Sequence, residues 1–319
     1  NKIPIKGYAT FHPLKHCWIG AGFKAEWFSD LPIAKNKKVM DPLKRIADET
    51  EEDYQELERI LLQAGVKTYR PNLTDEKYKS MENITDKTQS NPRDAYGVVG
   101  EKLYIWHVVT GDENILSKIN PKQVDWTSPG KCNISTANLV RVGKDLFWDI
   151  YEPSAQLDTD HFIKKWEEDG FRIHLSNRGY HSDGSFCVVK PGCIVSLYNV
   201  QDYAKEFPGW EVLYVPDRSW SKLSPFRTMR EKVGGKWWLK GEEHNDQLIE
   251  FVNTWLNDWV GYVEETVFDV NMLSIDENTI ICNNYNKEVF AHFKKHKVEP
   301  IIFNFRHRYF WDGGVHCIT

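Results

Sequence analysis

The sequence contains no apolar run long enough to span a bilayer, and no charged-then-apolar signal segment stands at its beginning. It also lacks a Gly-x-Gly-x-x-Gly motif and a P-loop, so nothing in it calls for a nucleotide or a flavin. No Cys-x-x-Cys pair occurs among the six cysteines, and His181, Cys187 and Cys193 do not have the usual ligand spacing of a zinc site. We therefore expect a cytoplasmic protein with reduced thiols and with neither a metal nor another cofactor.

Positive charge is not in excess either. The 319 residues carry a formal net charge of −5, which argues against non-specific binding to nucleic acid or to an anionic membrane. With 41% hydrophobic and 27% charged residues, the composition is ordinary for a soluble globular protein. The length admits two domains or one large α/β unit.

A repeated strand pair is the main organising feature of the chain. Aromatic and β-branched residues interrupted by a turn of small or polar residues are typical of a β-hairpin. Such stretches occur at residues 11–20, 95–106, 138–148, 185–195 and 270–281.

Helical patterns follow at least four of these hairpins, and each leads into another apolar strand. The predicted helices cover residues 50–64, 160–169, 201–207 and 286–297, and the strands that follow cover 66–69, 171–175, 210–215 and 300–305. The second unit is less clear, because residues 112–126 show only a weak helix-then-strand pattern. Five hairpin-helix-strand units in a ring would point their strand ends at a common axis, so we predict one α/β domain over residues 1–319.

Two regions fall outside the repeat. Residues 72–91 are polar and predict a loop with one helical turn. Residues 218–262 are a tryptophan-rich insertion, and Leu248, Val252, Trp255 and Trp259 recur there at helical spacing. We expect this amphipathic helix to pack against the core rather than to present a surface for a partner or ligand.

Three polar motifs stand beside the hairpins. Pro-Arg-Asp at 92–94 precedes the second hairpin, His-Ser-Asp at 181–183 precedes the fourth, and Gly-Gly-Val-His-Cys at 313–317 follows the fifth unit. The two glycines free the backbone for a close approach, and the cysteine after them is a potential nucleophile. Taken singly, Asp94 could cap a turn and Cys317 could be inert. The three motifs therefore indicate an active site only when they are taken together.

These motifs, in this order, resemble those of the amidinotransferase family of guanidino-modifying enzymes, of which glycine amidinotransferase is the familiar member. The opening Phe-His-Pro-Leu-Lys-His-Cys-Trp-Ile-Gly at 11–20 is similar to the first strand of the family, and residues 65–71 fit its helix-to-strand passage. The resemblance covers nearly the whole chain. It implies a five-bladed α/β propeller, which agrees with the repeat.

The resemblance also implies roles for four residues. Cys317 would be the nucleophile, His181 the general acid and base, and Asp94 and Asp183 the carboxylates that hold a guanidinium. The chemistry suits these residue types, because paired carboxylates fix a planar cation in one orientation. A bound cation and a neighbouring imidazolium both favour the thiolate over the thiol, and the imidazole can protonate the leaving amine.

The chain departs from the family pattern in two places. Ahead of the third hairpin the family has a carboxylate that orients the histidine and another acid three residues later, whereas Ser135 and Asn138 stand here. Serine cannot stabilise an imidazolium charge as a carboxylate does, and Asp312 is a candidate to compensate. The arginine that binds the donor carboxylate in related enzymes is also missing from residues 195–200, which leaves Arg218 or Arg227 in the insertion as alternatives.

The predicted function is transfer of an amidino group, from arginine or a similar guanidino donor to an amine acceptor, through a covalent cysteine intermediate. A hydrolase of a guanidino compound with the same thiol chemistry, a deiminase or dihydrolase, is the first alternative. The second is a catalytically impaired binding protein on this scaffold, which Ser135 favours. The expected partners are these small molecules, without nucleic acid or membrane, and a homodimer is one possible assembly.

Overall fold

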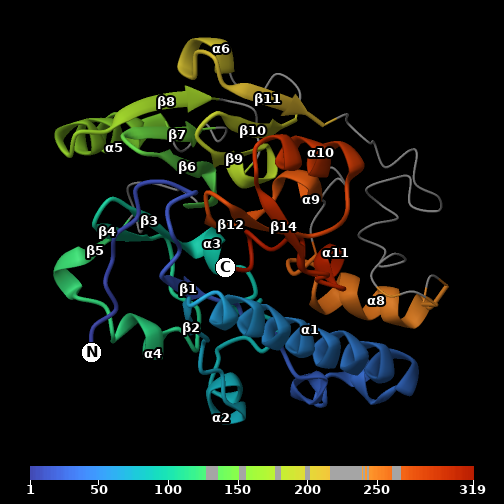
Figure 1. The fold of residues 1–319 in the computed structure, drawn as a ribbon. Helices are drawn as coiled ribbons and strands as arrows, with labels where there is room; N and C mark the ends of the chain where they lie inside the picture. The colour runs from blue at the N-terminus through green and yellow to red at the C-terminus, as the bar shows by residue number, and fades with distance from the viewer. Residues whose placement is uncertain are drawn as a thin grey trace.

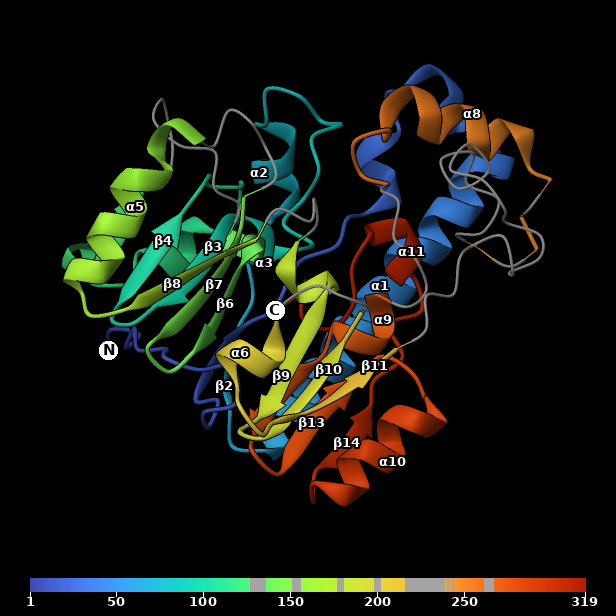
Figure 2. The ribbon, with the colours of Figure 1, turned by 90° about the horizontal axis from the view of Figure 1, so that it is seen from above.

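The computed structural model describes residues 1–126, 136–150, 156–176, 181–197, 202–215, 239, 241–242, 244–260 and 267–319. Its strands form five small sheets. Figures 1 and 2 show that the sheets stand around a common centre and that the C-terminus lies in the middle of the molecule. The fold is a five-bladed α/β propeller, as the sequence predicts.

Four of the five sheets share one design, in which a hairpin is extended by a third strand parallel to its second strand. The hairpins at residues 95–106, 138–148, 185–195 and 270–281 are thus confirmed. Gly100 and Gly192 turn two of them with φ angles of 63° and 83°, a region that favours glycine. The strands are β3 (Tyr96–Val99), β4 (Lys102–Ile105), β5 (Val124–Trp126), β6 (Leu139–Val142), β7 (Asp145–Asp149), β8 (Arg172–Ser176), β9 (Phe186–Lys190), β10 (Cys193–Ser196), β11 (Glu211–Tyr214), β12 (Leu273–Asp276), β13 (Thr279–Cys282) and β14 (Glu299–Ile302).

A parallel third strand needs a crossover, and in each of these blades a helix lies within it. These helices are α4 (Glu113–Leu116), α5 (Gln156–Glu168), α6 (Tyr203–Glu206) and α10 (Lys287–Lys295). The predicted helices in the last three blades are confirmed. The weak pattern at residues 112–126 corresponds to α4, the short helix η3 (Pro121–Gln123) and β5.

The prediction for the first blade was wrong in one respect. Residues 11–20 supply a single strand, β1 (His16–Trp18), which pairs in parallel with β2 (Lys67–Tyr69). The residues before β1 bond to other blades instead: Leu14 N donates to Ile275 O at 2.8 Å, and Ala9 forms a bridge with Val142. The apolar residues that predict a hairpin therefore link blades to one another.

The first long helix, α1 (Lys37–Gln63), begins well before the predicted start at residue 50. Asn36 caps it by accepting from Lys38 N at 2.9 Å, and Pro42 lies inside it. Proline costs a helix one hydrogen bond, but buried Val39 and Leu43 extend the apolar stripe. Packing of these side chains on the core offsets the cost of the proline.

The insertion contributes α8 (Asp246–Trp255), which packs on α1. Leu248 and Val252 are buried in a core cluster shared with α1, and Trp259, just beyond the helix, is buried there too. The predicted amphipathic helix and its core packing are confirmed. Arg218 and Arg227 lie outside the described residues, so the extent of the insertion and its arginines stay predictions.

The remaining described elements are short. The helical turn predicted within residues 72–91 is α2 (Asp75–Lys79). The others are η1 (Ala25–Phe28), η2 (Pro32–Lys35), α3 (Pro92–Ala95), η4 (Thr136–Asn138), η6 (Ser182–Gly184), α9 (Val267–Val270) and α11 (Arg308–Trp311).

Within the described ranges, no helix has the length and apolar character needed to cross a bilayer. The five cysteines that the structure describes are all free, and Cys132 lies outside those ranges.

One buried hydrogen bond between α1 and α11 offers a test of the fold. The Trp311 indole Nε1 donates to Thr50 Oγ1 at 2.9 Å, and both side chains are fully buried. Thr50→Val leaves the indole N–H without a partner, so we expect the free energy of unfolding to fall by about 1–3 kcal/mol. Urea denaturation measures the change. Thr50→Ser keeps the acceptor and is the matched control; an equal loss in both variants would contradict this role for the hydrogen bond.

Candidate active site

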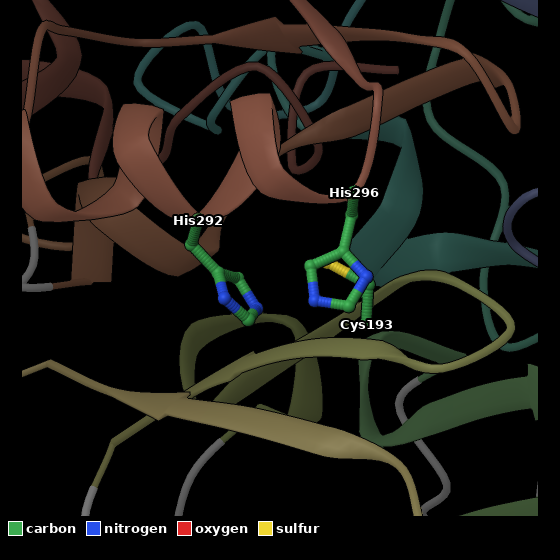
Figure 3. A group of neighbouring side chains, drawn as sticks. All are labelled: Cys193, His292 and His296. Atoms are coloured by element: carbon green, nitrogen blue, oxygen red, sulfur yellow. The ribbon is translucent and has the colours of Figure 1, made fainter.

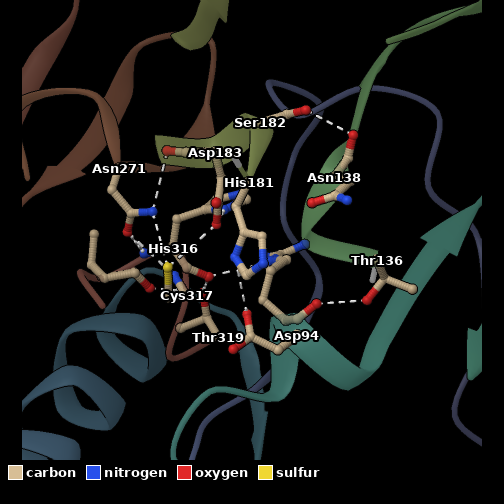
Figure 4. Close-up of polar contacts among 12 residues, drawn as sticks. Asp94, Thr136, Asn138, His181, Ser182, Asp183, Asn271, His316, Cys317 and Thr319 are labelled. Atoms are coloured by element: carbon tan, nitrogen blue, oxygen red, sulfur yellow. Dashed lines mark hydrogen bonds and ion pairs between the residues drawn. The ribbon is translucent and has the colours of Figure 1, made fainter. Parts of the chain in front are cut away.

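The polar residues at the centre of the ring come from equivalent places in the blades. In four blades a short helical turn immediately precedes the first strand of the hairpin: α3 before β3, η4 before β6, η6 before β9 and α9 before β12. Asp94, Asn138 and Asp183 lie in the first three turns, and Asn271 directly follows α9. The same local structure thus places one polar residue from each of these four blades near the centre, and Figure 4 shows Asp183 and Asn271 beside Cys317 and Asn138 farther away.

The C-terminal turn completes the site, and its two glycines are required by close contacts. A Cβ on Gly314 would lie 2.7 Å from Asn271 Oδ1 and from Asn283 Nδ2, and one on Gly313 would lie 2.7 Å from Cys317 Cβ. The close approach expected for this Gly-Gly pair therefore exists. Its partners are protein side chains, between which the backbone passes to reach Cys317.

Asn271 and Asn283 hold the turn that carries the cysteine. Asn271 Oδ1 accepts from the backbone N of His316 at 3.0 Å and of Cys317 at 3.3 Å, while its Nδ2 lies 3.1 Å from the Cys317 sulfur. Asn283 Oδ1 accepts from Val315 N at 2.8 Å, and its Nδ2 donates to Asn271 O at 2.6 Å. Both asparagines fix the position of the sulfur.

The sequence analysis missed these asparagines. Asn271 could have been found, because it stands just ahead of the fifth hairpin, where Asp94 and Asp183 stand ahead of theirs. Asn283 follows β13 and shares no sequence pattern with the other site residues.

Asp183 is the most connected group of the site. Its Oδ2 accepts from His316 Nδ1 at 2.8 Å and from the thiol of Cys317 at 3.4 Å, and the side chain is only 4% exposed. Burial opposes its charge, but the His316 hydrogen bond and electrostatic interactions with His316, His181 and Arg93 lower its pKa. Among the described residues no donor reaches Asp183 Oδ1. This ionised carboxylate has one oxygen in use and one available to a cation.

The thiol of Cys317 is held in its neutral form. Burial, followed by the negative charges of Asp183 and Asp94, raises its pKa well above the usual value, and the hydrogen bond from Asn271 only partly opposes this. The residue is 7% exposed. A cation placed beside the two carboxylates would remove much of the charge that disfavours the thiolate.

His181 has a carboxylate neighbour of its own. Its Nδ1 lies 3.7 Å from Asp94 Oδ1, and the two side chains are 39% and 33% exposed. Burial raises the pKa of Asp94, and the charge of His181 acts in the opposite direction. Asp94 also interacts electrostatically with Cys317, and His181 with Asp183; Figure 4 draws the four side chains together. The structure therefore brings the four main predicted residues, Cys317, His181, Asp94 and Asp183, into one cluster.

The other predicted residues lie differently. Ser135 is outside the described residues. Asn138 is buried and is joined to the His181 turn through its backbone, since Ser182 Oγ donates to Asn138 O at 2.7 Å. Asp312 caps α11 in the left-handed conformation with a φ angle of 57°. The roles proposed for these three residues beside the histidine stay predictions.

Arg93 donates two hydrogen bonds to the C-terminal turn. Its Nε donates to His316 O at 3.3 Å, and its backbone N donates to Cys317 O at 3.4 Å. Thr136 Oγ1 in turn donates to Arg93 O at 2.6 Å. Arg93 thus links the turn of the second blade to the chain that carries Cys317.

A cavity of about 610 Å³ lies behind this cluster. Its lining includes much of the first eighteen residues, together with Arg93, Arg141, Asp183 and His316, whereas Cys317, His181 and Asp94 do not line it. Burial lowers the pKa of Arg141 there to about 10. Asp183 and His316 therefore form the wall between this cavity and the thiol.

No protein-family model and no curated protein matches the sequence. Solved structures do match. An amidinotransferase of the saxitoxin biosynthetic pathway from Microseira wollei is 17% identical, with a TM-score of 0.69 over 99% of this chain and 96% of that one. Inosamine-phosphate amidinotransferase from Streptomyces griseus is 14% identical, with a TM-score of 0.63 over 98% and 95%. Dimethylarginine dimethylaminohydrolase from Pseudomonas aeruginosa is 9% identical, with a TM-score of 0.57 over 96% and 98%. At these identities the likeness establishes the fold, and it confirms the resemblance drawn from the sequence at that level.

The protonated thiol yields a direct prediction. Asp183→Asn removes the carboxylate that accepts the thiol proton, so the pKa of Cys317 should fall. We expect alkylation of Cys317 by iodoacetamide at pH 7 to become about tenfold faster, because one pKa unit changes the thiolate fraction tenfold. Peptide mass spectrometry across a pH series measures the rate for this cysteine alone.

Asp94→Asn is the comparison variant, since Asp94 acts on the thiol less strongly than Asp183 does. Its alkylation rate should rise by a smaller factor. An Asp183→Asn protein with an unchanged pH profile would contradict this account of the thiol.

Proposed function

We propose that the protein transfers an amidino group from arginine, or a similar guanidino donor, to an amine acceptor through a covalent intermediate on Cys317. The observation that carries the proposal is the pairing of Cys317 with Asp183, at 3.4 Å, next to a carboxylate oxygen that no described donor reaches. A cationic electrophile can bind to the second oxygen of this buried carboxylate and then lies next to the thiol. The fold shared with two amidinotransferases supports the same conclusion.

Binding of the donor rests on the two carboxylates. Asp183 Oδ1 and Asp94 would accept hydrogen bonds from the planar guanidinium and hold it against the sulfur. The cation offsets the charges that raise the pKa of Cys317, so donor binding favours the thiolate. The nucleophile is thus activated by its own substrate.

The first step balances without another reactant. The sulfur attacks the central carbon of the guanidinium, and the bond from that carbon to the alkyl-bearing nitrogen breaks. The proton that leaves the thiol passes to His181 and from there to the departing amine. Asp94, 3.7 Å from His181, stabilises the imidazolium formed in between. The products are an amidino group bonded to the Cys317 sulfur, which is an S-alkyl isothiouronium cation, and a neutral amine.

Transfer and hydrolysis differ in the bonds that break and in the second nucleophile. In transfer, the acceptor amine attacks the carbon, the carbon–sulfur bond breaks, and His181 passes the proton lost by the amine to the sulfur, which restores the thiol. In a deiminase, the first step instead breaks the bond to an unsubstituted nitrogen and releases ammonia, and water then displaces the sulfur to give citrulline. Transfer is the function we propose, because the two amidinotransferases match this chain with higher TM-scores, 0.69 and 0.63, than the hydrolase with 0.57.

A binding protein with a disabled histidine is less consistent with the site. The argument for that function is the serine at position 135, where the family has an acid. Asp94 gives His181 a carboxylate neighbour in its place, at 3.7 Å. The proton-transfer pair is therefore available without the missing acid.

Incubation with arginine, alone and with a panel of primary amines, tests the proposal. We expect ornithine to form only when an acceptor amine is present, without release of ammonia. Citrulline or ammonia formed without any amine would establish the hydrolase instead. An inactive protein across guanidino donors would contradict both and support the binding protein.

The covalent intermediate has its own test. After mixing with a reactive donor, intact mass spectrometry should show an amidino adduct in the wild-type protein and none in Cys317→Ala. Cys282→Ala, which removes another buried cysteine, should still form the adduct. An adduct that persists in Cys317→Ala would place the nucleophile elsewhere.

A further inference from the structure

A second group of reactive side chains lies away from the site, between the fourth and fifth blades. The Cys193 sulfur and one ring nitrogen each of His292 and His296 lie within 4.8 Å of one another. Cys193 is the first residue of β10, His292 lies in α10, and His296 is the C-cap residue of that helix. Figure 3 shows the two imidazoles directed from the helix toward the strand that carries the cysteine.

The fold explains why these residues meet. His292 and His296 are one helical turn apart, so they lie on the same face of α10. That face belongs to a core cluster in which Val289 and Phe293 of α10 pack with Cys193 and Val195 of the fourth blade. Packing between blades therefore presents two imidazoles to one thiol.

Glu211 adds a fourth ligand-bearing side chain. It is the register partner of Cys193 in the parallel pair of β10 and β11. Its Oε2 lies 2.9 Å from His296 Nε2, and its Oε1 lies 3.9 Å from His292 Nδ1. Glu211 thus contacts both histidines of the group formed by Cys193, His292 and His296.

The orientation of His292 is also fixed. Its Nε2 lies 3.1 Å from Ile194 O, a carbonyl that can only accept, so this nitrogen carries the proton. The lone pair is then on Nδ1, the atom on the side of Glu211. Histidines that bind metal usually donate their other ring N–H to a backbone carbonyl or a carboxylate in this way.

We propose that Cys193, Glu211, His292 and His296 form a structural zinc site that joins the fourth and fifth blades. Thiolate and imidazole are the ligands that zinc prefers in proteins, and four ligands match its tetrahedral geometry. Bond lengths of about 2.0–2.3 Å place tetrahedral ligand atoms about 3.5 Å apart. The ligand atoms of Cys193, His292 and His296 need to close by only about 1 Å from their present limit of 4.8 Å, and Glu211 joins them from its contacts with the two histidines.

The charges balance at this site, in which Cys193 is buried and the Glu211 side chain is 42% exposed. Zinc binding releases the thiol proton of Cys193 to solvent, and the resulting thiolate and the Glu211 carboxylate together offset the two positive charges of the ion. Without an ion, Glu211 is paired with His296 and with Lys295, whose Nζ lies 2.8 Å away. That ion-pair network accounts for the histidines, while the sulfur of Cys193 packs in the core cluster beside them.

Cobalt binding tests the site directly, because a thiolate ligand gives cobalt(II) a charge-transfer absorption band. The titration uses full-length protein carrying Cys317→Ala, so that the active-site thiol does not contribute. We expect the band to saturate at one equivalent of cobalt per chain and to disappear on addition of zinc. Both Cys193→Ser and His296→Gln should lose it.

Cys282→Ser is the matched control, since Cys282 is buried in the same core cluster but is not part of the group. It should keep the band. His296→Gln is the gentler of the two site variants, because His296 is half-buried and its side chain lies at the end of α10, so it should remain folded. Zinc should raise the thermal midpoint of the parent protein and leave that of His296→Gln unchanged.

Absence of the band in folded parent protein would overturn the proposal in favour of the ion-pair network. A band that survives in Cys193→Ser would overturn it as well, because the ion would then bind another thiol. The reaction at Cys317 enters neither outcome, so this test is independent of the proposed function.

Discussion

The contact between the Asp183 carboxylate and the Cys317 thiol is the interaction on which the rest of the site depends. A carboxylate that is 4% exposed can stay ionised only when donors or cations compensate its lost hydration. Here His316 and the thiol donate to one oxygen, and Arg93 and His181 interact with the carboxylate through space. The same arrangement keeps the sulfur protonated and leaves one carboxylate oxygen for a cation.

The propeller makes this contact possible by repetition. In four blades a short helical turn precedes the first strand of the hairpin. Each turn places a polar residue near the centre of the ring. The C-terminal chain then threads between two asparagines, where any side chain on Gly314 would collide with both. Asn283 and Asn271 accept hydrogen bonds from the backbone of this turn. The backbone that carries Cys317 is therefore held in place by these two side chains.

Much of this arrangement could be predicted from the sequence. Four hairpins follow from alternating apolar and turn residues, which are local signals, and the three site motifs stand beside them. The first blade could not be predicted in full, because Leu14 and Ala9 pair with other blades through contacts that no local pattern records. The start of α1 was missed for a related reason: the buried positions Val39 and Leu43 outweigh a proline that usually ends a helix.

The polar contacts were harder to predict than the elements. The serine at position 135 suggested a histidine without an acid, but Asp94 lies 3.7 Å from His181, and only the folded chain shows that proximity. Asn271 and Asn283 act through bonds to the backbone of the C-terminal turn, and asparagine is too common in turns to be informative by itself. Likewise Cys193 and His296 are about a hundred positions apart, and the packing of α10 on a neighbouring blade brings them together.

A nucleophile held as a thiol has a chemical advantage in the proposed reaction. Oxidants and alkylating agents attack the thiolate, so a sulfur whose proton is shared with Asp183 is protected until a donor arrives. A neutral ligand cannot release that protection, because it leaves the charges of Asp183 and Asp94 in place. In the proposed reaction a guanidinium would release that protection, with its carbon facing the sulfur. The two carboxylates would then select the substrate by charge and activate Cys317 in the same event.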